Sequence, residues 1–410
     1  MKKILYLCTM MLLSFNGIGQ INGDFNWSQT PVFYDNFNTS GRIWDDQFID
    51  QPIRKWHSYY YGTGVTHGWA EHQAFQRTQC HFDINSGTIK LASDYTSYTP
   101  MTCDDFEIPN VIWLDCDDQY LIDNNLRLFY YSGAIETNRY FRYGYFEMRC
   151  KLPIHKGAFP AFWLFCGADS IDPHYEEIDI FEFSWYLYDK PENPLHHTLH
   201  PTRMFTNGSL FANNANGIGN SCGRRYIKVP SNTALDSWNT FGCEWSPNRI
   251  VYYLNGEAVN EYYSTDSVPH RPMTLIANYA LDEYSVIHLN NGTGPSIPCP
   301  EYFPDTMYID YIKVNQLKCD CDENVVLTDN QDVSNFDYGV KKTISFVPDN
   351  GISISSGRRM VFRATDGILI NPGVEVQQGR ELELIIHPCP DYNVREEEIE
   401  SYKNRKIITQ

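Results

Sequence analysis

The chain has 410 residues, 42% hydrophobic and 15% aromatic, and its formal net charge is −19 at pH 7. This acidic balance argues against nucleic acid as a partner, because phosphate binding needs concentrated lysine and arginine. It argues less strongly against a heavily sulfated polymer, since one basic groove could override the overall field. The aromatic excess lies in many short alternating runs and favours an all-β protein.

The N-terminus has the pattern of a secretory signal peptide. Met1-Lys2-Lys3 precedes an apolar run over residues 4–13, and small residues follow at Gly17 and Gly19. A basic start, a short apolar core and small residues near a break are typical of such peptides. We therefore assign residues 1–19 to a signal peptide and expect a secreted, periplasmic or cell-surface protein. No later stretch reaches the roughly 18 apolar residues of a membrane span, and we expect a monomer.

Short alternating segments fill the chain from about residue 30 to residue 316. Among the strands that they predict are residues 33–37, 87–91, 145–152, 249–254 and 307–314. Asn255-Gly256 follows one of them and predicts a tight hairpin. No segment keeps a helical period over three turns. Residues 20–316 are therefore expected to form an antiparallel two-sheet β-sandwich.

The composition changes after this region. Residues 317–345 are polar and contain Cys319-Asp320-Cys321, so we predict a linker. The cysteine spacing does not match a zinc site. Apolar pairs then recur about every ten residues over residues 346–390, between glycines, and predict a small stacked β module. Residues 391–410 form a charged tail. One of the 12 cysteines lies in the signal peptide, so the odd remainder leaves at least one thiol free.

A run of acidic and apolar residues at 176–183 has the pattern of a catalytic strand: Glu-Glu-Ile-Asp-Ile-Phe-Glu-Phe. Side chains alternate along a strand, so Glu177 and Asp179 share a face and Glu182 would lie opposite. A one-residue bulge at Ile180–Phe181 would return Glu182 to their face. Neighbouring buried carboxylates separate in pKa, which supplies one ionised and one protonated acid. A solvated acidic face and a calcium site are the alternatives.

The run from Glu177 to Glu182 resembles the bulged catalytic signature of glycoside hydrolase family 16. Further segments resemble strands of that family in the same order: residues 132–135, 143–153, 160–164, 244–250 and 307–311. The resemblance covers about residues 30–316 and implies a jelly-roll sandwich with a concave substrate cleft. It also implies an endo-acting enzyme that cleaves a β-linked polysaccharide with retention. Glu177 would be the nucleophile, Glu182 the acid/base and Asp179 an auxiliary carboxylate.

The same resemblance implies several substrate-binding residues. His196 would lie near Glu182, with His200 as the second choice, and a structural role for either histidine is the alternative. Trp163 would form the floor of a sugar subsite, and Trp185 would lie at its rim. Core packing is an equally good explanation of each tryptophan. Trp69 and Glu71 resemble the family's loop beside the cleft, but Ala70 stands where the family commonly has asparagine.

No cofactor is required by this chemistry. Asp310 is a candidate ligand for a structural calcium ion that many family members hold, and the alternative is an aspartate that caps a turn.

The expected substrate is a β-1,3- or mixed β-1,3/1,4-glucan. A β-galactan of the agarose, porphyran or carrageenan type is the alternative, because basic residues such as the Arg224-Arg225 pair could bind sulfate. A glycan-binding protein without turnover is the third reading. The C-terminal module resembles a β-stack module found in secreted proteins of Bacteroidetes-type bacteria.

Overall fold

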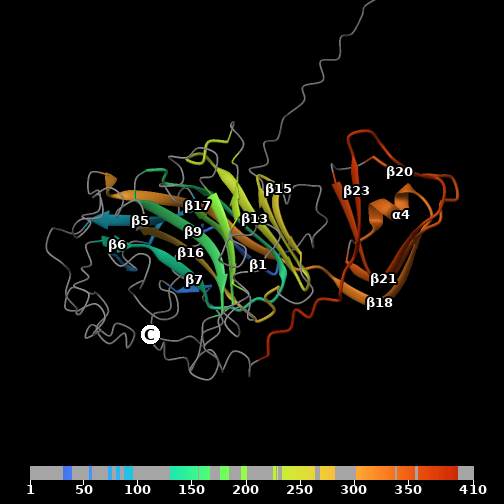
Figure 1. Cartoon of the computed structure of the whole chain (residues 1–410), viewed down its shortest axis with the longest axis horizontal. Coiled ribbons are helices and arrows are strands. Elements are labelled where there is room, and N and C mark those ends of the chain that lie inside the picture. The colour runs from blue at the N-terminus through green and yellow to red at the C-terminus, as the bar shows by residue number, and fades with distance from the viewer. Residues whose placement is uncertain are drawn as a thin grey trace, which may run out of the picture.

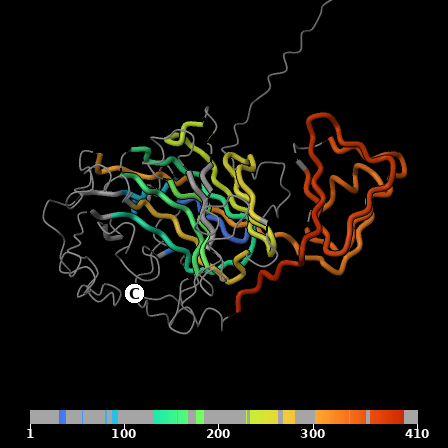
Figure 2. Tube along the Cα trace, viewed as in Figure 1, coloured from blue at the N-terminus to red at the C-terminus, as the bar shows by residue number. Residues whose placement is uncertain are grey.

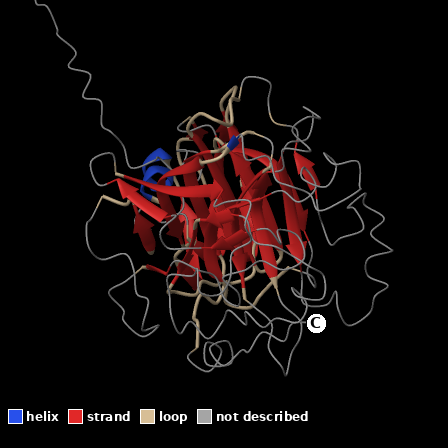
Figure 3. Cartoon of the chain, turned by 90° about the vertical axis from the view of Figure 1, so that its left-hand side faces the viewer, coloured by secondary structure: helices blue, strands red, loops and turns tan. Residues whose placement is uncertain are grey.

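A computed structural model gives the fold, with a large β-sandwich and a smaller β unit beside it (Figure 1). It describes residues 31–38, 55–57, 73–75, 80–83, 87–95, 130–155, 157–166, 176–183, 195–200, 225–227, 229, 233–263, 268–281, 302–337, 339–355 and 359–395. Strands dominate these residues, and the expected all-β fold is confirmed (Figure 3).

The first sheet of the sandwich is almost wholly antiparallel. Its strands within the described residues are, in spatial order, β15 (Glu257–Tyr263), β14 (Arg249–Leu254), β13 (Asn239–Ser246), β8 (Gly144–Lys151), β17 (Asp305–Asn315), β5 (Thr88–Tyr95), β6 (Tyr130–Ser132) and β3 (Gln73–Phe75). Two further strands pair at its side, β1 (Phe33–Asp35) with β17 and β4 (Cys80–Asp83) with β5. The predicted hairpin is confirmed, because Asn255 and Gly256 both have positive φ between β14 and β15.

The second sheet carries the acidic strand in its interior, with two described strands on one side and four on the other. Its order is β12 (Arg225–Ile227), β11 (Leu195–His200), β10 (Glu177–Phe183), β9 (Ala158–Phe165), β16 (Thr274–Leu281), β7 (Ala134–Thr137) and β2 (Trp56–His57). The two sheets pack through their apolar faces, where Phe181 of β10 meets Phe241 of β13 with ring centroids 4.3 Å apart. The opposite face of the second sheet is called here the outer face.

The C-terminal unit is a stack of parallel strands, traced in orange to red in Figure 2. One sheet has the order β18 (Cys319–Leu327), β19 (Val340–Phe346), β21 (Arg359–Ile370) and β23 (Glu381–Ile386). A second, small sheet pairs β20 (Ile352–Ile354) with β22 (Val374–Val376). Helix α4 (Asn330–Asn335) lies between β18 and β19 along the chain and contributes Val333 to the core of the unit. A stacked β module was expected here, but it is larger than the sequence suggested.

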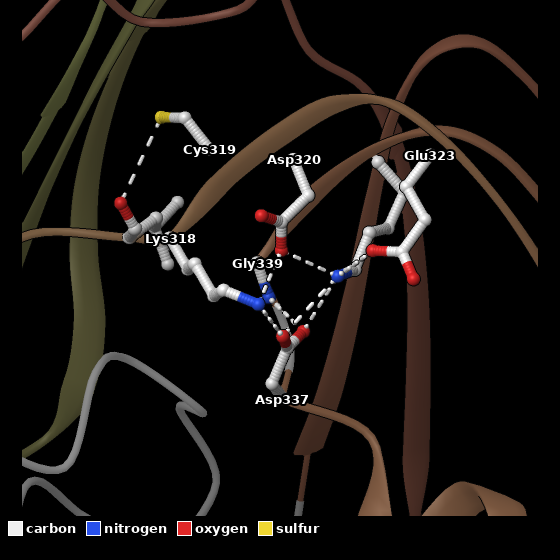
Figure 4. Close-up of polar contacts among 8 residues, drawn as sticks. Lys318, Cys319, Asp320, Glu323, Asp337 and Gly339 are labelled. Carbon is white, nitrogen blue, oxygen red and sulfur yellow. Dashed lines mark hydrogen bonds and ion pairs between the residues drawn. The ribbon is translucent and has the colours of Figure 1, made fainter.

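Residues 317–345 are not a linker, because β18, α4 and β19 belong to the stack. Their polar residues form an ion network instead (Figure 4). The ammonium of Lys341 is buried with its side chain 3% exposed, and it lies 2.7 Å from carboxylate oxygens of both Asp320 and Glu323. Asp337 completes the set at 3.1 Å. Charged residues whose composition predicted a solvated linker therefore surround one buried cation.

The C-terminal module packs against the outer side of the first sheet. An apolar cluster joins Tyr145, Val251 and Tyr253 of the sandwich to Val340 and Val361 of the module. A disulfide between Cys321 and Cys389 closes the module, while Cys319 remains a free thiol.

Two ion pairs cross the same interface. Arg363 lies 3.1 Å from Glu244 with both side chains almost fully buried, and Arg249 lies 3.0 Å from Glu383. The predicted charged tail also begins inside this interface. The hydroxyl of Tyr392 accepts a hydrogen bond from the backbone N–H of Leu317 at 3.1 Å. Apolar packing and ion pairs thus hold the module against the sandwich.

His387 makes this interface sensitive to acid. Its Nδ1 lies 2.7 Å from the carbonyl of Pro388, which can only accept, so Nδ1 carries the hydrogen. Burial, together with the charge of Arg363, lowers the pKa of His387 to about 4, although Glu244 opposes the shift. In the unfolded chain the imidazole titrates near 6.5. Only the unfolded state therefore gains the proton as the pH falls from about 6.5 to about 4.

We expect His387 to remove about 3 kcal/mol of stability across that pH range, since one unit of pKa corresponds to about 1.4 kcal/mol. The stability is complete above pH 6.5 and is lost below it. The measurement is the melting temperature of the wild type and of His387→Gln from pH 7.5 to pH 4. The wild-type curve should fall more steeply than that of the variant, and two parallel curves would contradict the assignment to His387.

None of the helices in the described part of the chain is long and apolar enough to cross a membrane.

Candidate active site

Strand β10 contains the bulge that the sequence predicts. On its β9 side, Asp179 pairs with Trp163, but the next partner, Phe162, pairs with Phe181. Ile180 is therefore the extra residue. On the β11 side the register also shifts between Asp179 and Glu182. A bulge of this kind re-aims the side chains that follow it.

The bulge brings three carboxylates to one face of the strand. Ile178, Ile180 and Phe181 are buried in the core between the sheets, so their neighbours Glu177, Asp179 and Glu182 face outward. Glu177 and Glu182 are half-buried, while Asp179 between them is only 3% exposed. Two solvent-reachable carboxyl groups thus flank a third that is enclosed.

Strand β9 supplies apolar surface beside these carboxylates. Its half-buried residues Phe165 and Trp163 pair with Glu177 and Asp179. The indole N–H of Trp163 donates to Oδ1 of Asn278 on β16 at 2.7 Å, which fixes the ring against the sheet. The outer face therefore places an aromatic ring beside the acidic row, and the role of Trp163 as the floor of a sugar subsite stays a prediction.

Strand β11 lies on the other side of the carboxylates. The register places His196 opposite Glu182 and His200 opposite Glu177. The roles of both histidines stay predictions. Trp69, Glu71 and Trp185 lie outside the described residues, and their roles also stay predictions.

Asp310 does not fit the calcium site that was considered for it. Its carboxylate on β17 forms an ion pair and a hydrogen bond with the guanidinium of Arg149 on β8. Across the part of the chain that the structure describes, no group of three or more His, Cys, Asp or Glu side chains could hold a metal ion. A cation at Asp310 would have to displace the arginine, so the residues present favour a structural ion pair.

Two residues of the site were not singled out from the sequence. Asn278 had no distinguishing signal, because a lone asparagine in a strand carries no pattern. Glu176 could have been noticed as a second glutamate directly before the proposed nucleophile. Its carboxylate is fully buried and accepts backbone hydrogen bonds from His270 and Arg271 at 2.9 and 2.7 Å. Burial raises the pKa of Glu176, and His270 and these hydrogen bonds oppose the shift.

The arrangement suits chemistry that needs two acids on one side of a substrate. One carboxylate can attack a carbon while the other gives a proton to the departing oxygen and later takes one from water. The enclosed Asp179 lies between them along the strand. Nothing in this scheme requires a metal ion.

Comparison with known proteins agrees with this geometry. The chain is 26% identical over 280 residues to the kappa-carrageenase of Pseudoalteromonas carrageenovora, covering 65% of this chain and 62% of that protein. It is 27% identical over 158 residues to a beta-glucanase of Acetivibrio thermocellus, covering 36% of this chain and 37% of that protein. The chain thus spans less than two thirds of the length of these relatives.

Among solved structures, the laminarinase of Flavobacterium sp. UMI-01 superposes with a TM-score of 0.46 at 20% identity, covering 70% of this chain and all of that one. The sequence model of glycosyl hydrolases family 16 matches residues 69–284, which is more than half of the chain and includes the whole of β10. The chain therefore belongs to glycosyl hydrolases family 16.

Proposed function

We propose that this protein is an endo-acting retaining glycoside hydrolase and that its substrate is a neutral β-1,3- or mixed β-1,3/1,4-glucan. The observation that carries the proposal is the bulge in β10, which turns Glu177, Asp179 and Glu182 to the outer face. Relatives named beta-glucanase, endo-1,3-1,4-beta-glycanase and glucan endo-1,3-beta-glucosidase support the choice of substrate.

In the proposed reaction, Glu177 attacks the anomeric carbon of the sugar while Glu182 protonates the departing glycosidic oxygen. A covalent glycosyl-enzyme ester forms on Glu177, and the leaving chain departs. Glu182, now ionised, removes a proton from water, which attacks the same carbon and releases Glu177. Two inversions give net retention of configuration. Asp179 would orient Glu177 and tune the charge of both Glu177 and Glu182.

The polarity of the outer face supports a neutral sugar. The outward residues of β9 and β16 are aromatic, aliphatic, amide or hydroxyl residues, and none of them is Lys or Arg: Phe159, Ala161, Trp163, Phe165, Thr274, Ile276, Asn278 and Ala280. A sulfate ester over this surface would lie close to the carboxylates of β10, whose negative charge repels it. The likeness to a kappa-carrageenase, which extends over 65% of this chain, keeps a β-galactan as the second candidate.

Reducing-sugar release from laminarin, lichenan, agarose, porphyran and carrageenan tests the substrate. We expect turnover of laminarin or lichenan and none of carrageenan, because the described floor offers sulfate no positive charge. Asp236→Ala is the matched control for the variants of Glu177 and Glu182, since this exposed carboxylate lies in the turn before β13. Release from carrageenan alone would replace the glucan by the galactan. Binding to a glycan array without release from any polymer would favour the non-catalytic reading.

We also propose that the protein is exported and then cleaved near residue 19. The disulfide between Cys321 and Cys389 supports this, because such bonds persist in oxidising compartments. Mass spectrometry of protein recovered from the medium or periplasm would give the new N-terminus, and retention of Met1 there would contradict the proposal.

A further inference from the structure

Glu176 connects the catalytic strand to a segment far away in the sequence. Its Oε2 accepts the backbone N–H groups of His270 and Arg271, and its Oε1 lies 3.5 Å from Nδ1 of His270. The side chain is completely buried. A carboxylate is removed from water at this cost only when donors replace its hydration. The carboxylate of Glu176 therefore holds the segment 268–273 against the start of β10.

The backbone of the same residue is held as well. The N–H of Glu176 donates to Sγ of Cys166 at 2.9 Å, and its carbonyl accepts from the N–H of Cys166 at 3.1 Å. Side chain and backbone together fix the residue that precedes Glu177. Because the two side chains alternate, Glu176 points toward the buried supports while Glu177 points to the outer face.

The segment 268–273 is itself anchored from behind. The carbonyl of Pro269 accepts from the indole N–H of Trp245 at 2.8 Å. Met273 exchanges two backbone hydrogen bonds with Phe141. The guanidinium Nε of Arg142 donates to the carbonyl of His270 at 2.9 Å. Glu176 thus rests on a segment that the core holds rigidly.

Arg142 carries this support to the C-terminal strap, defined here as residues 388–395. Its Nη1 donates to the carbonyl of Asn393 at 2.8 Å while its Nε is engaged with His270. Tyr392 beside Asn393 is packed against the core of the sandwich and against the apolar cluster at the interface with the module. One continuous series of contacts therefore leads from the strap through Arg142 and the segment 268–273 to Glu176.

We propose that Glu176 is a positioning residue for the nucleophile Glu177 and that the C-terminal strap, through Arg142, is part of its support. The proposal rests on the proposed function, because it concerns the same two-carboxylate reaction. A nucleophile must be held within about 0.5 Å of its productive position, and a displacement of about 1 Å can cost a hundredfold in rate. The C-terminal strap would then contribute to the position of the nucleophile and so to the rate of the reaction.

The first experiment compares Glu176→Ala with Glu176→Gln in the full chain. The alanine removes the acceptor of the N–H groups of His270 and Arg271, so kcat should fall about 10- to 100-fold while KM changes less than about threefold. The glutamine keeps an oxygen for both N–H groups, so its kcat should stay within about threefold of the wild type. The pH profile should keep its shape in both variants, because the reacting groups are unchanged. An unchanged kcat in Glu176→Ala, or equal losses in both variants, would overturn the proposal.

The second experiment tests whether Glu176 acts by holding the start of β10 in place, and not by stabilising the whole fold or by taking part in the reaction. Arg142→Met should lower kcat several-fold, whereas Arg139→Met, whose guanidinium donates to the carbonyl of Val32 instead, should not. Amide hydrogen exchange, measured well below the melting temperature of each protein, should become faster over residues 268–273 and at the start of β10 in Glu176→Ala. Unchanged exchange there would overturn the positioning role.

A wild type inactive on every polymer would overturn the proposed function and, with it, the catalytic half of this inference. The exchange measurement would still decide whether Glu176 holds the strand.

Discussion

Replacing Glu177 by alanine is expected to lower turnover of the β-glucan by about a thousandfold or more, because no glycosyl-enzyme ester can form. Replacing Glu182 by alanine should cost about 10²- to 10⁴-fold on the polymer, the range of a general acid. The rates alone therefore do not distinguish the two roles. The stereochemistry of azide trapping on an aryl β-glycoside does, because the small anion enters the space that each truncated carboxylate leaves.

In Glu182→Ala, an aryl leaving group departs without a proton, and azide then attacks the ester on Glu177. The product is a β-glycosyl azide, which retains the configuration of the substrate. In Glu177→Ala, azide attacks the substrate directly from the opposite face and gives the α-azide. The configuration is read by nuclear magnetic resonance of the product. An α-azide from Glu182→Ala would reverse the two assignments, and full activity in both variants would refute the catalytic reading of β10.

The catalytic strand could be predicted because its pattern is local. Alternation along the strand fixes which side chains share a face, and apolar Ile178 and Ile180 identify the buried face. The bulge was predictable for the same reason, since Glu182 falls on the wrong face without it. The register in β10 confirms both steps. The position of Glu176 was not accessible in this way, because its partners His270 and Arg271 lie more than 90 residues further along the chain.

The extent of the C-terminal module was wrong for a related reason. A polar stretch is taken for a linker when its charges are assumed to be solvated. In β18 the charges of Asp320 and Glu323 instead neutralise Lys341 of β19, which is buried. Pairing between strands made those residues compatible with a packed sheet, and composition alone contains no information about pairing.

The interface between the sandwich and the module escaped prediction because the partners of its buried ion pair, Glu244 and Arg363, lie 119 residues apart. Glu244 sits in a strand that matches the family pattern, and Arg363 in a segment assigned to a separate unit. Although burial raises the pKa of Glu244, the guanidinium groups of Arg363 and Arg249 outweigh it and hold that pKa below its ordinary value. The carboxylate is thus charged inside the interface and depends on its partner.

Arg363→Met should therefore destabilise the protein by about 3 kcal/mol or more, since it leaves Glu244 as a buried charge. The neighbouring Arg249 and the hydroxyl of Tyr253, 3.3 Å from Glu244, keep the loss from being larger. The double variant Glu244→Gln, Arg363→Met should recover part of this loss, because both charges are then gone. Lys318→Met is the matched control. Its exposed ammonium also pairs with carboxylates of the module, and its loss should matter little.

Urea unfolding of the four proteins measures these differences and the cooperativity of the fold. Domains that merely touch unfold separately, whereas domains joined by a buried interface share one transition. A single transition that shifts in Arg363→Met and returns toward the wild type in the double variant would mean that sandwich and module are stabilised as one body. Two transitions, with the sandwich unmoved, would show that the pair does not couple them. The strap would then be unable to transmit support from the module to Glu176, and only the contacts of Arg142 within the sandwich would remain.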